Sequence, residues 1–232
     1  CVMPIHLYGQ QALLAEVYRL ARRHHIAVVE DAAQAVGVVS ARLGTAVCYS
    51  FYPTKVLGAL GDAGAIASED ATFIAWARKL RNYGIGDQVT LRQDTFGVNS
   101  RLDELHAAFL RCMLPMTHGF IAERQHLAGV YYRYLPPSVL HRDLAEPSNW
   151  HLFTIIVEER ERVQKALAAM GIGTKVHYPT PAHHQVPTQR RDVQLLMTEW
   201  LCGRVLSLPL FEGMTEKQVK YVADCVKKVT HA

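Results

Sequence analysis

The sequence has few cysteines and no pattern that would join them into a framework. The five cysteines among 232 residues are Cys1, Cys48, Cys112, Cys202 and Cys225. Their number is odd and no two show the CxxC spacing. A small secreted scaffold or a zinc site usually carries paired cysteines at short spacings. We therefore expect reduced thiols, and with them a cytoplasmic protein.

Long hydrophobic runs and blocks of like charge are also missing. No apolar run reaches the roughly 18 residues that a membrane span needs, and no signal peptide is visible. The 25 Lys and Arg residues are spread along the chain, whereas nucleic-acid-binding proteins usually gather basic charge on one segment or face. We therefore expect neither a membrane nor a nucleic acid as a partner. The net charge of +4 suits a phosphorylated ligand.

The chain has no methionine at position 1, no internal repeat and no low-complexity segment. It starts at Cys1, inside what reads as a core strand, and we expect it to be a fragment or the product of a truncated reading frame. Half of the residues are hydrophobic and 20% are charged, which is typical of a soluble globular enzyme.

Apolar runs and helical periodicities alternate in the first part of the chain. Strands are predicted over Val2 to Leu7 and Ile26 to Val29, with a helix over Gln11 to His24 between them. Further strands are predicted over Ala46 to Phe51 and Ala63 to Ala67. This order predicts an α/β layer, in which ligand sites form beyond the carboxyl ends of the strands.

The later part of the chain changes its pattern. Residues 82–97 read as a long loop, a long helix is predicted over Thr117 to Tyr134, and a small α+β unit follows. The predicted organisation is therefore a truncated cofactor-binding domain over residues 1–115 and a small C-terminal domain over residues 116–232.

An acid and an amine lie at the ends of neighbouring predicted strands. Asp31 follows one strand, and Lys55 follows the next in Ser50-Phe51-Tyr52-Pro53-Thr54-Lys55. A pyridoxal phosphate (PLP) enzyme needs this pair, because the amine forms a Schiff base with the cofactor aldehyde and the carboxylate keeps the pyridine nitrogen protonated. Taken singly, Lys55 reads as a solvated surface charge, like most lysines, and Asp31 reads more readily as a helix N-cap.

Three polar residues nearby are further candidates for the site. Gln34 lies one helical turn beyond Asp31 and is placed to share its face. Ser50 is either a strand-end hydroxyl or a phosphate ligand. Asn99 either starts the following helix or binds an anion there.

The twelve histidines raise the question of a metal site. The best cluster is His177, His183 and His184, but adjacent histidines in a strand point to opposite faces, and no third ligand has convincing spacing. We therefore expect no metal. Tyr178 and His183 are better candidates for substrate contacts, although a surface turn at 179–181 explains them almost as well.

Six motifs in order resemble the sugar aminotransferases of the DegT/DnrJ/EryC1/StrS group. They are Glu30-Asp31-Ala32-Ala33-Gln34-Ala35, Ser50-Phe51-Tyr52-Pro53-Thr54-Lys55, Gly61-Asp62-Ala63-Gly64, Leu80-Arg81-Asn82-Tyr83-Gly84, Asn99-Ser100-Arg101-Leu102-Asp103-Glu104 and His177-Tyr178-Pro179. The resemblance runs nearly end to end. It implies a fold-type I PLP-dependent transferase of the α/β class, here the C-terminal part of the large mixed-sheet domain followed by a small α+β domain.

The resemblance also implies roles for these residues. Lys55 would be the Schiff-base lysine and proton shuttle, and Asp31 the partner of the pyridinium nitrogen. Gln34 would lie against the cofactor ring, Ser50 would bind the cofactor phosphate, and Asn99 would reach the same phosphate in the neighbouring subunit of a homodimer. The residues expected near the sugar-nucleotide pocket are His177, Tyr178 and His183.

The implied reaction is amination of a nucleotide-linked keto sugar in amino-sugar and polysaccharide biosynthesis, with L-glutamate as amino donor. The motifs are most similar to those of enzymes acting on dTDP-3-keto-6-deoxyhexoses. The family's N-terminal part is absent, Val56 replaces a common Asn and Gly203 replaces a common acidic residue, so the chemistry is assigned to the complete enzyme. Two alternatives remain open: a sugar dehydratase of the same fold, against which Lys55 speaks, and a non-catalytic or decayed member.

Overall fold

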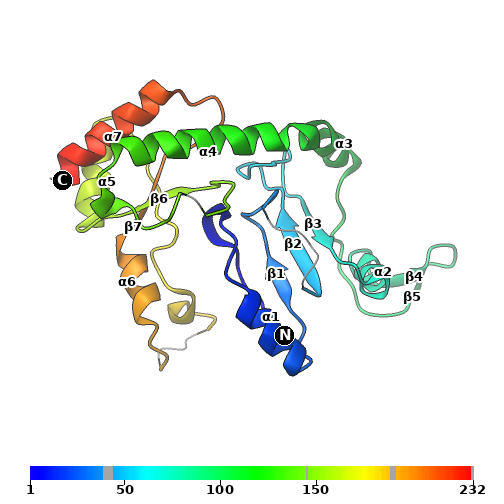
Figure 1. Cartoon of the computed structure of the whole chain (residues 1–232). Helices are drawn as coiled ribbons and strands as arrows, with labels where there is room; N and C mark the ends of the chain where they lie inside the picture. Colours follow the sequence, from blue (N-terminus) through cyan, green and yellow to red (C-terminus); the bar gives the residue numbers. More distant parts are fainter. Residues whose placement is uncertain (39–43, 145, 189–191, 231–232) are drawn as a thin grey trace. The chain divides into compact units, whose positions relative to one another are not determined.

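The computed structural model describes residues 1–38, 44–144, 146–188 and 192–230 (Figure 1). Contacts divide the chain into two compact units, Cys1–Ile121 and Ala122–Ala232. The division falls inside the long helix α4 (Thr117–Tyr134), and the domain boundary predicted from the sequence lies just before that helix begins.

The first unit is built around a small mixed sheet of three strands. Its elements before α4 are η1 (Leu7–Gly9), α1 (Ala15–Arg23), β1 (Val29–Asp31), β2 (Ala46–Ser50), β3 (Gly64–Ala67), α2 (Ala71–Leu80), β4 (Ile85–Asp87), β5 (Arg92–Gln93), α3 (Glu104–Met113) and η2 (Leu114–Met116). The strand order is β1-β2-β3, with β1 parallel and β3 antiparallel to β2. The parallel pair brings the carboxyl ends of β1 and β2 to the same edge, where the sequence predicts a site.

The start of the chain lies beside β1 on the edge away from β2. Val2 bridges Val28 and Ile5 bridges Asp31, both in the parallel sense. The strand predicted over Val2 to Leu7 is therefore reduced to two bridges, because Leu7–Gly9 turns away as a 3-10 helix. The predicted strand at Ile26 begins later than expected, since Ile26 is 40% exposed and β1 starts only at Val29.

Helix α2 begins with a capped first turn, because Asp70 Oδ1 accepts hydrogen bonds from the backbone N–H groups of Thr72 at 2.8 Å and Phe73 at 3.0 Å. The long loop predicted over residues 82–97 is wrong in part, because β4 and β5 pair there as a short antiparallel hairpin. Its polar strands lack the alternation of apolar residues that marks a half-buried strand.

The second unit holds a two-stranded antiparallel pair with helices packed on it. Its elements after α4 are η3 (Pro137–Val139), β6 (Phe153–Ile156), α5 (Arg160–Ala169), η4 (Ala182–His184), α6 (Leu196–Arg204), β7 (Val205–Leu208) and α7 (Glu216–Thr230). Helix α5 is in contact with both β7 and α7 (Figure 1). One further backbone bridge joins Lys175 to Ser207 of β7.

One continuous hydrophobic cluster fills this unit. It is centred on Tyr131, Trp150 and Phe153, whose rings stack with centroids 4.4 Å (Tyr131–Phe153) and 5.5 Å (Trp150–Phe153) apart. Helix α7 begins with a capping box, in which the side chains of Thr215 and Gln218 each accept a hydrogen bond from the other's backbone N–H.

Among the described residues, no helix has the length and apolar character needed to cross a bilayer. All five cysteines are free thiols, and Cys225 is buried in the core of the second unit.

Candidate functional site

Asp31 is fixed by hydrogen bonds at the carboxyl end of β1. Its backbone N–H donates to the Pro4 carbonyl and its carbonyl accepts from the His6 N–H, both at 2.9 Å. Its side-chain Oδ1 accepts from the Ala33 N–H at 3.0 Å. The residues after Asp31 form turns rather than a helix, so the helix N-cap interpretation is wrong, and the carboxylate caps a turn beyond the strand end.

The neighbouring residue, Glu30, anchors β1 from the opposite face of the strand. Its carboxylate is buried, with Oε2 accepting from His6 Nε2 at 2.9 Å and Oε1 accepting from the Tyr18 hydroxyl. The Ala12 N–H donates to His6 Nδ1 at 3.0 Å, so Nε2 carries the imidazole proton. Side chains alternate along a strand, and Glu30 therefore holds β1 in place while Asp31 faces the other way.

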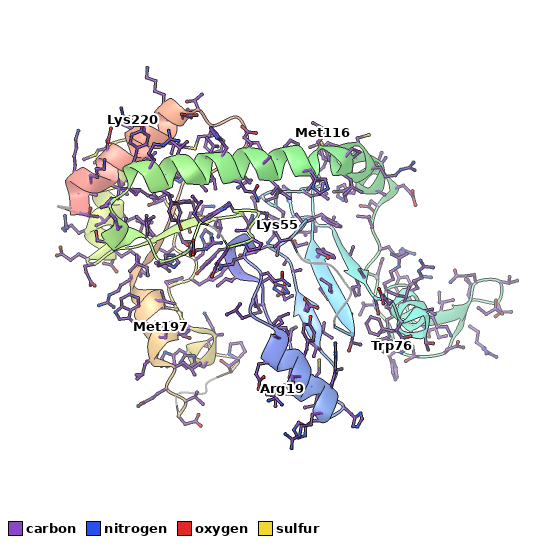
Figure 2. All side chains as sticks on the ribbon, viewed as in Figure 1. Arg19, Lys55, Trp76, Met116, Met197 and Lys220 are labelled. Carbon is purple, nitrogen blue, oxygen red and sulfur yellow. The ribbon has the colours of Figure 1, made fainter. Side chains whose placement is uncertain are left out.

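Lys55 lies in a tight loop directly after β2. The Lys55 N–H donates to the Tyr52 carbonyl at 2.8 Å, closing a turn. The backbone then passes so close to itself that a Cβ on Gly58 would lie 2.6 Å from the Pro53 carbonyl oxygen, which only glycine permits. Figure 2 shows the labelled Lys55 at one end of the β1–β2–β3 sheet.

The environment of Lys55 is that of a lysine partly withdrawn from water. Burial lowers the pKa of the Lys55 amine, and the negative charge of Asp31 raises that pKa by a smaller amount. Burial also raises the pKa of the Cys48 thiol, and Asp31 adds to that rise. Cys48 is the register partner of Asp31 in the parallel pair. The amine and the carboxylate therefore share one neighbourhood at the strand ends, which holds a lysine that is more easily deprotonated than a solvated one.

Gln34 and Ser50 border this neighbourhood. Gln34 Oε1 accepts a hydrogen bond from the Tyr8 N–H at 2.6 Å, which ties the turns after Asp31 to the start of the chain. Ser50 is the last residue of β2, and its Oγ accepts from the Tyr52 N–H at 3.3 Å.

Ser50 also lines a cavity of about 1000 Å³ within the first unit. The same cavity is lined by Arg78 and Arg81 from the end of α2 and by Arg101 and Ser100 before α3. Guanidinium groups and hydroxyls are donors suited to phosphate oxygens. Ser50 was predicted from the sequence and these arginines were not, because they come together only when α2 and the segment before α3 pack beside β2 and β3.

Asn99 lies at the base of the β4–β5 hairpin and is exposed. Its Nδ2 donates to the Tyr83 hydroxyl at 2.8 Å, and its backbone bridges that of Asn82. Arg101 stacks over the same Tyr83 ring, with its guanidinium carbon 5.5 Å from the ring centroid. These contacts hold Asn99 next to the arginine-lined cavity wall.

The three substrate candidates all lie in the second unit. His177 Nδ1 is 2.8 Å from Ser207 Oγ, and its ring contacts that of the half-exposed Tyr178 edge to face at 5.5 Å. His183 is buried, and its Nε2 donates to Glu199 Oε1 at 3.0 Å. The expectation that His183 and His184 point to opposite faces is wrong, because they form a 3-10 turn and not a strand. Glu199 was not identified from the sequence.

Comparison with known proteins places this geometry in a family. The model of the DegT/DnrJ/EryC1/StrS aminotransferase family matches residues 1–227. The chain belongs to this family. The resemblance carried by the six motifs is thereby confirmed.

Individual relatives agree with that assignment. Over 99% of its length the chain is 35% identical to the UDP-N-acetyl-3-dehydro-alpha-D-glucosamine 3-aminotransferase of Acidithiobacillus ferrooxidans. Over 98% it is 36% identical to the dTDP-3-amino-3,4,6-trideoxy-alpha-D-glucose transaminase of Streptomyces venezuelae. The chain spans 64% and 62% of the lengths of these two relatives.

A solved structure shows the same fold. The Bacillus subtilis protein ntda, solved with bound cofactor PMP, superposes with a TM-score of 0.91 at 29% identity, over 99% of this chain and 56% of that one. The predicted α/β fold of the PLP-dependent transferases is therefore confirmed. Aminotransferases of this family use PLP. The residues present fit that cofactor, because an amine with a lowered pKa lies near a carboxylate and a hydroxyl borders an arginine-lined cavity.

Proposed function

We propose that this protein serves the PLP-dependent transfer of an amino group from L-glutamate to a nucleotide-linked keto sugar. The observation that carries the proposal is that Lys55 and Asp31 lie near each other at the ends of neighbouring strands. The Lys55 amine is held where burial lowers its pKa, and the Asp31 carboxylate acts on the same amine. Family membership supplies the reaction class.

Lys55 and Asp31 have complementary roles in this proposal. PLP supplies an electron sink that stabilises negative charge at the carbon losing its proton. Lys55, deprotonated more readily than a solvated lysine, provides the nucleophilic amine. It then moves the proton that the carbon loses. Asp31, fixed by its backbone bonds to Pro4 and His6, holds the proton on the pyridine nitrogen.

The remaining polar residues orient the cofactor. Gln34, anchored to the Tyr8 backbone, would lie against the ring, and Ser50 would bind the phosphate. The arginines that share a cavity with Ser50 add positive charge for that phosphate. Asn99 contributes its amide to the phosphate bound by the partner subunit of a homodimer with shared sites.

The substrate would be recognised by the second unit. His177, Tyr178 and His183 offer ring nitrogens and a hydroxyl as hydrogen-bonding groups, and Tyr178 is 48% exposed. Relatives named for both UDP-linked and dTDP-linked sugars support a nucleotide sugar as the substrate class. Amino-sugar and polysaccharide biosynthesis in the cytoplasm is the setting that we propose.

The test is the covalent attachment of PLP to Lys55. Protein mixed with PLP should develop a visible absorption band, and borohydride reduction should leave the added mass on the peptide that contains Lys55. Lys55→Ala should abolish both signals. Lys79→Ala is the matched control, because Lys79 is an exposed lysine of the same unit that pairs with Asp94 at 2.7 Å, and it should leave both unchanged. Added mass at Lys79, or an unchanged band in Lys55→Ala, would overturn the assignment.

The reaction itself is tested with a panel of nucleotide-linked keto sugars and L-glutamate. Formation of a sugar amine together with 2-oxoglutarate is expected. Loss of water from the sugar without amine formation would assign a dehydratase instead, and PLP binding without either product would assign a non-catalytic member.

A further inference from the structure

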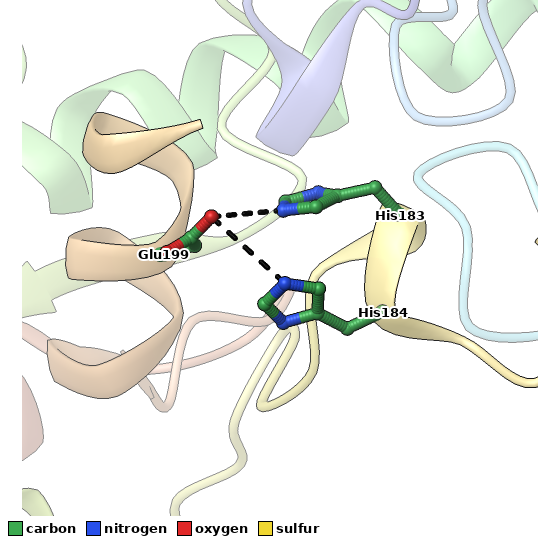
Figure 3. Close-up of side chains that lie close together, drawn as sticks. All are labelled: His183, His184 and Glu199. Carbon is green, nitrogen blue, oxygen red and sulfur yellow. Dashed lines mark hydrogen bonds and ion pairs between the residues drawn. The ribbon is translucent and has the colours of Figure 1, made fainter. Parts of the chain in front are cut away.

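A cluster of two imidazoles and one carboxylate lies within the second unit. Figure 3 shows His183 and His184 reaching from η4 toward Glu199 on α6. Glu199 Oε1 is 3.0 Å from His183 Nε2 and 3.9 Å from His184 Nε2. One donor atom from each residue lies within 4.8 Å of the other two. Three side chains from two separate elements therefore converge on one point.

The separations match those of ligands around a small divalent ion. Zinc binds imidazole nitrogen and carboxylate oxygen at about 2.0–2.2 Å, and in a tetrahedral site such ligand atoms lie roughly 3.3–3.5 Å from one another. The two distances to Glu199 lie on either side of this value. An ion is accommodated by small side-chain movements, in which coordination replaces the hydrogen bond from His183 to Glu199.

The carboxylate is held in position by the backbone of its own helix start. The Leu195 N–H donates to Glu199 Oε1 at 3.0 Å, and bonds of this kind orient a metal-binding carboxylate. The His183 ring is only 9% exposed, whereas the side chains of His184 and Glu199 are 36% and 31% exposed. The point of convergence is therefore partly enclosed but open to an ion from solvent.

We propose that His183, His184 and Glu199 bind a zinc ion, with water completing the coordination. Two imidazoles and one carboxylate are a ligand set that suits Zn²⁺. The ion would join the η4 turn to α6. This inference does not depend on aminotransfer, because binding is measured without PLP or substrate. Zinc binding would compete with the substrate role proposed for His183, since a zinc ion and a sugar hydroxyl would bind to the same Nε2 atom.

The test is a calorimetric titration of the protein with Zn²⁺ after metal removal with EDTA and dialysis. The wild type should bind one equivalent. His184→Asn and Glu199→Gln should each weaken that binding by at least ~10-fold, the loss that outer-shell partners of metal ligands alone produce. The matched control is His126→Asn, because His126 forms an exposed pair with Glu216 at 2.8 Å in the same unit and lies outside the cluster. It should leave the binding constant unchanged.

A second measurement on the unmutated protein guards against variants that fail to fold. Co²⁺ added at substoichiometric amounts should broaden the imidazole NMR signals of His183 and His184 before those of the other histidines. Equal zinc affinity in wild type, His184→Asn and Glu199→Gln would overturn the proposal. Equal loss in His126→Asn, or broadening spread over all twelve histidines, would show that binding is dispersed over surface imidazoles and would also overturn it.

Discussion

The two units bury their apolar side chains in different ways. In the second unit one continuous cluster joins α4, β6, α5, β7 and α7. In the first unit the buried residues form three small clusters, one between α1 and β1, one around Ala32, Ala35 and Val47, and one at Leu57, Ala59 and Leu110. The end of β1 that carries Asp31 and the loop that carries Lys55 lie among these small clusters. The second unit is therefore held by one continuous hydrophobic core. In the first unit the core is divided into small clusters, and polar groups lie between them at the strand ends.

The buried charged side chains of the two units also differ in what they join. In the second unit Arg124 donates to the carbonyls of Trp150 and Leu210, both at 3.1 Å, and pairs with Glu212 at 2.6 Å, so it joins segments of the large core. In the first unit the buried carboxylate of Glu30 joins β1 to α1 and to the start of the chain through Tyr18 and His6. A small core thus relies more on a polar network for its order.

Matched leucine truncations should reveal the largest difference between the units. Leu167 is 0% exposed in the continuous cluster and Leu110 is 8% exposed in a small one. Leu167→Ala should lower the free energy of unfolding by about 4 kcal/mol and Leu110→Ala by about 2 kcal/mol, since a site with fewer packed neighbours collapses more easily around the lost atoms. Urea unfolding followed by intrinsic fluorescence measures both. Equal losses would contradict the contrast between the two cores.

The polar network of the first unit should have a smaller effect. Glu30→Gln should lower the free energy of unfolding by about 2 kcal/mol, because the amide N–H group would face the donor of either Tyr18 or His6 and leave it unsatisfied. Tyr18→Phe removes one hydrogen bond and keeps the bond between His6 and Glu30. It should therefore lower the free energy of unfolding by about 1 kcal/mol. Hydrogen exchange at the β1 amides should accelerate in Glu30→Gln. Unchanged exchange there would show that Glu30 does not hold the strand.

Candidate site residues could be predicted where they follow a strand end closely along the chain. Asp31 and Lys55 were predicted because each follows an apolar run. The arginines of the cavity were missed, since Arg78 and Arg101 meet only through the packing of α2 beside β2 and β3. Glu199 was missed for a similar reason, because it meets His183 across 16 positions of sequence.

Secondary structure was missed where a local pattern was weak or continuous with its neighbour. Strand β7 follows α6 without an intervening turn residue. The sequence therefore does not mark where the helix ends and the strand Val205–Leu208 begins. The histidine pair was misjudged because a strand was assumed where Ala182–His184 forms a 3-10 turn. In each case the deciding contacts come from residues distant in sequence.

The central claim, that Lys55 and Asp31 act at one site, is tested most directly by the pKa of Lys55 itself. NMR titration of isotope-labelled lysine amines should give Lys55 a pKa below its usual value, because burial disfavours the charged amine. Asp31→Asn should lower this pKa further, since the negative charge of Asp31 raises the pKa of Lys55. Asp62→Asn should leave the pKa of Lys55 unchanged. A Lys55 pKa equal to that of solvated lysines, or one that does not respond to Asp31→Asn, would contradict the account.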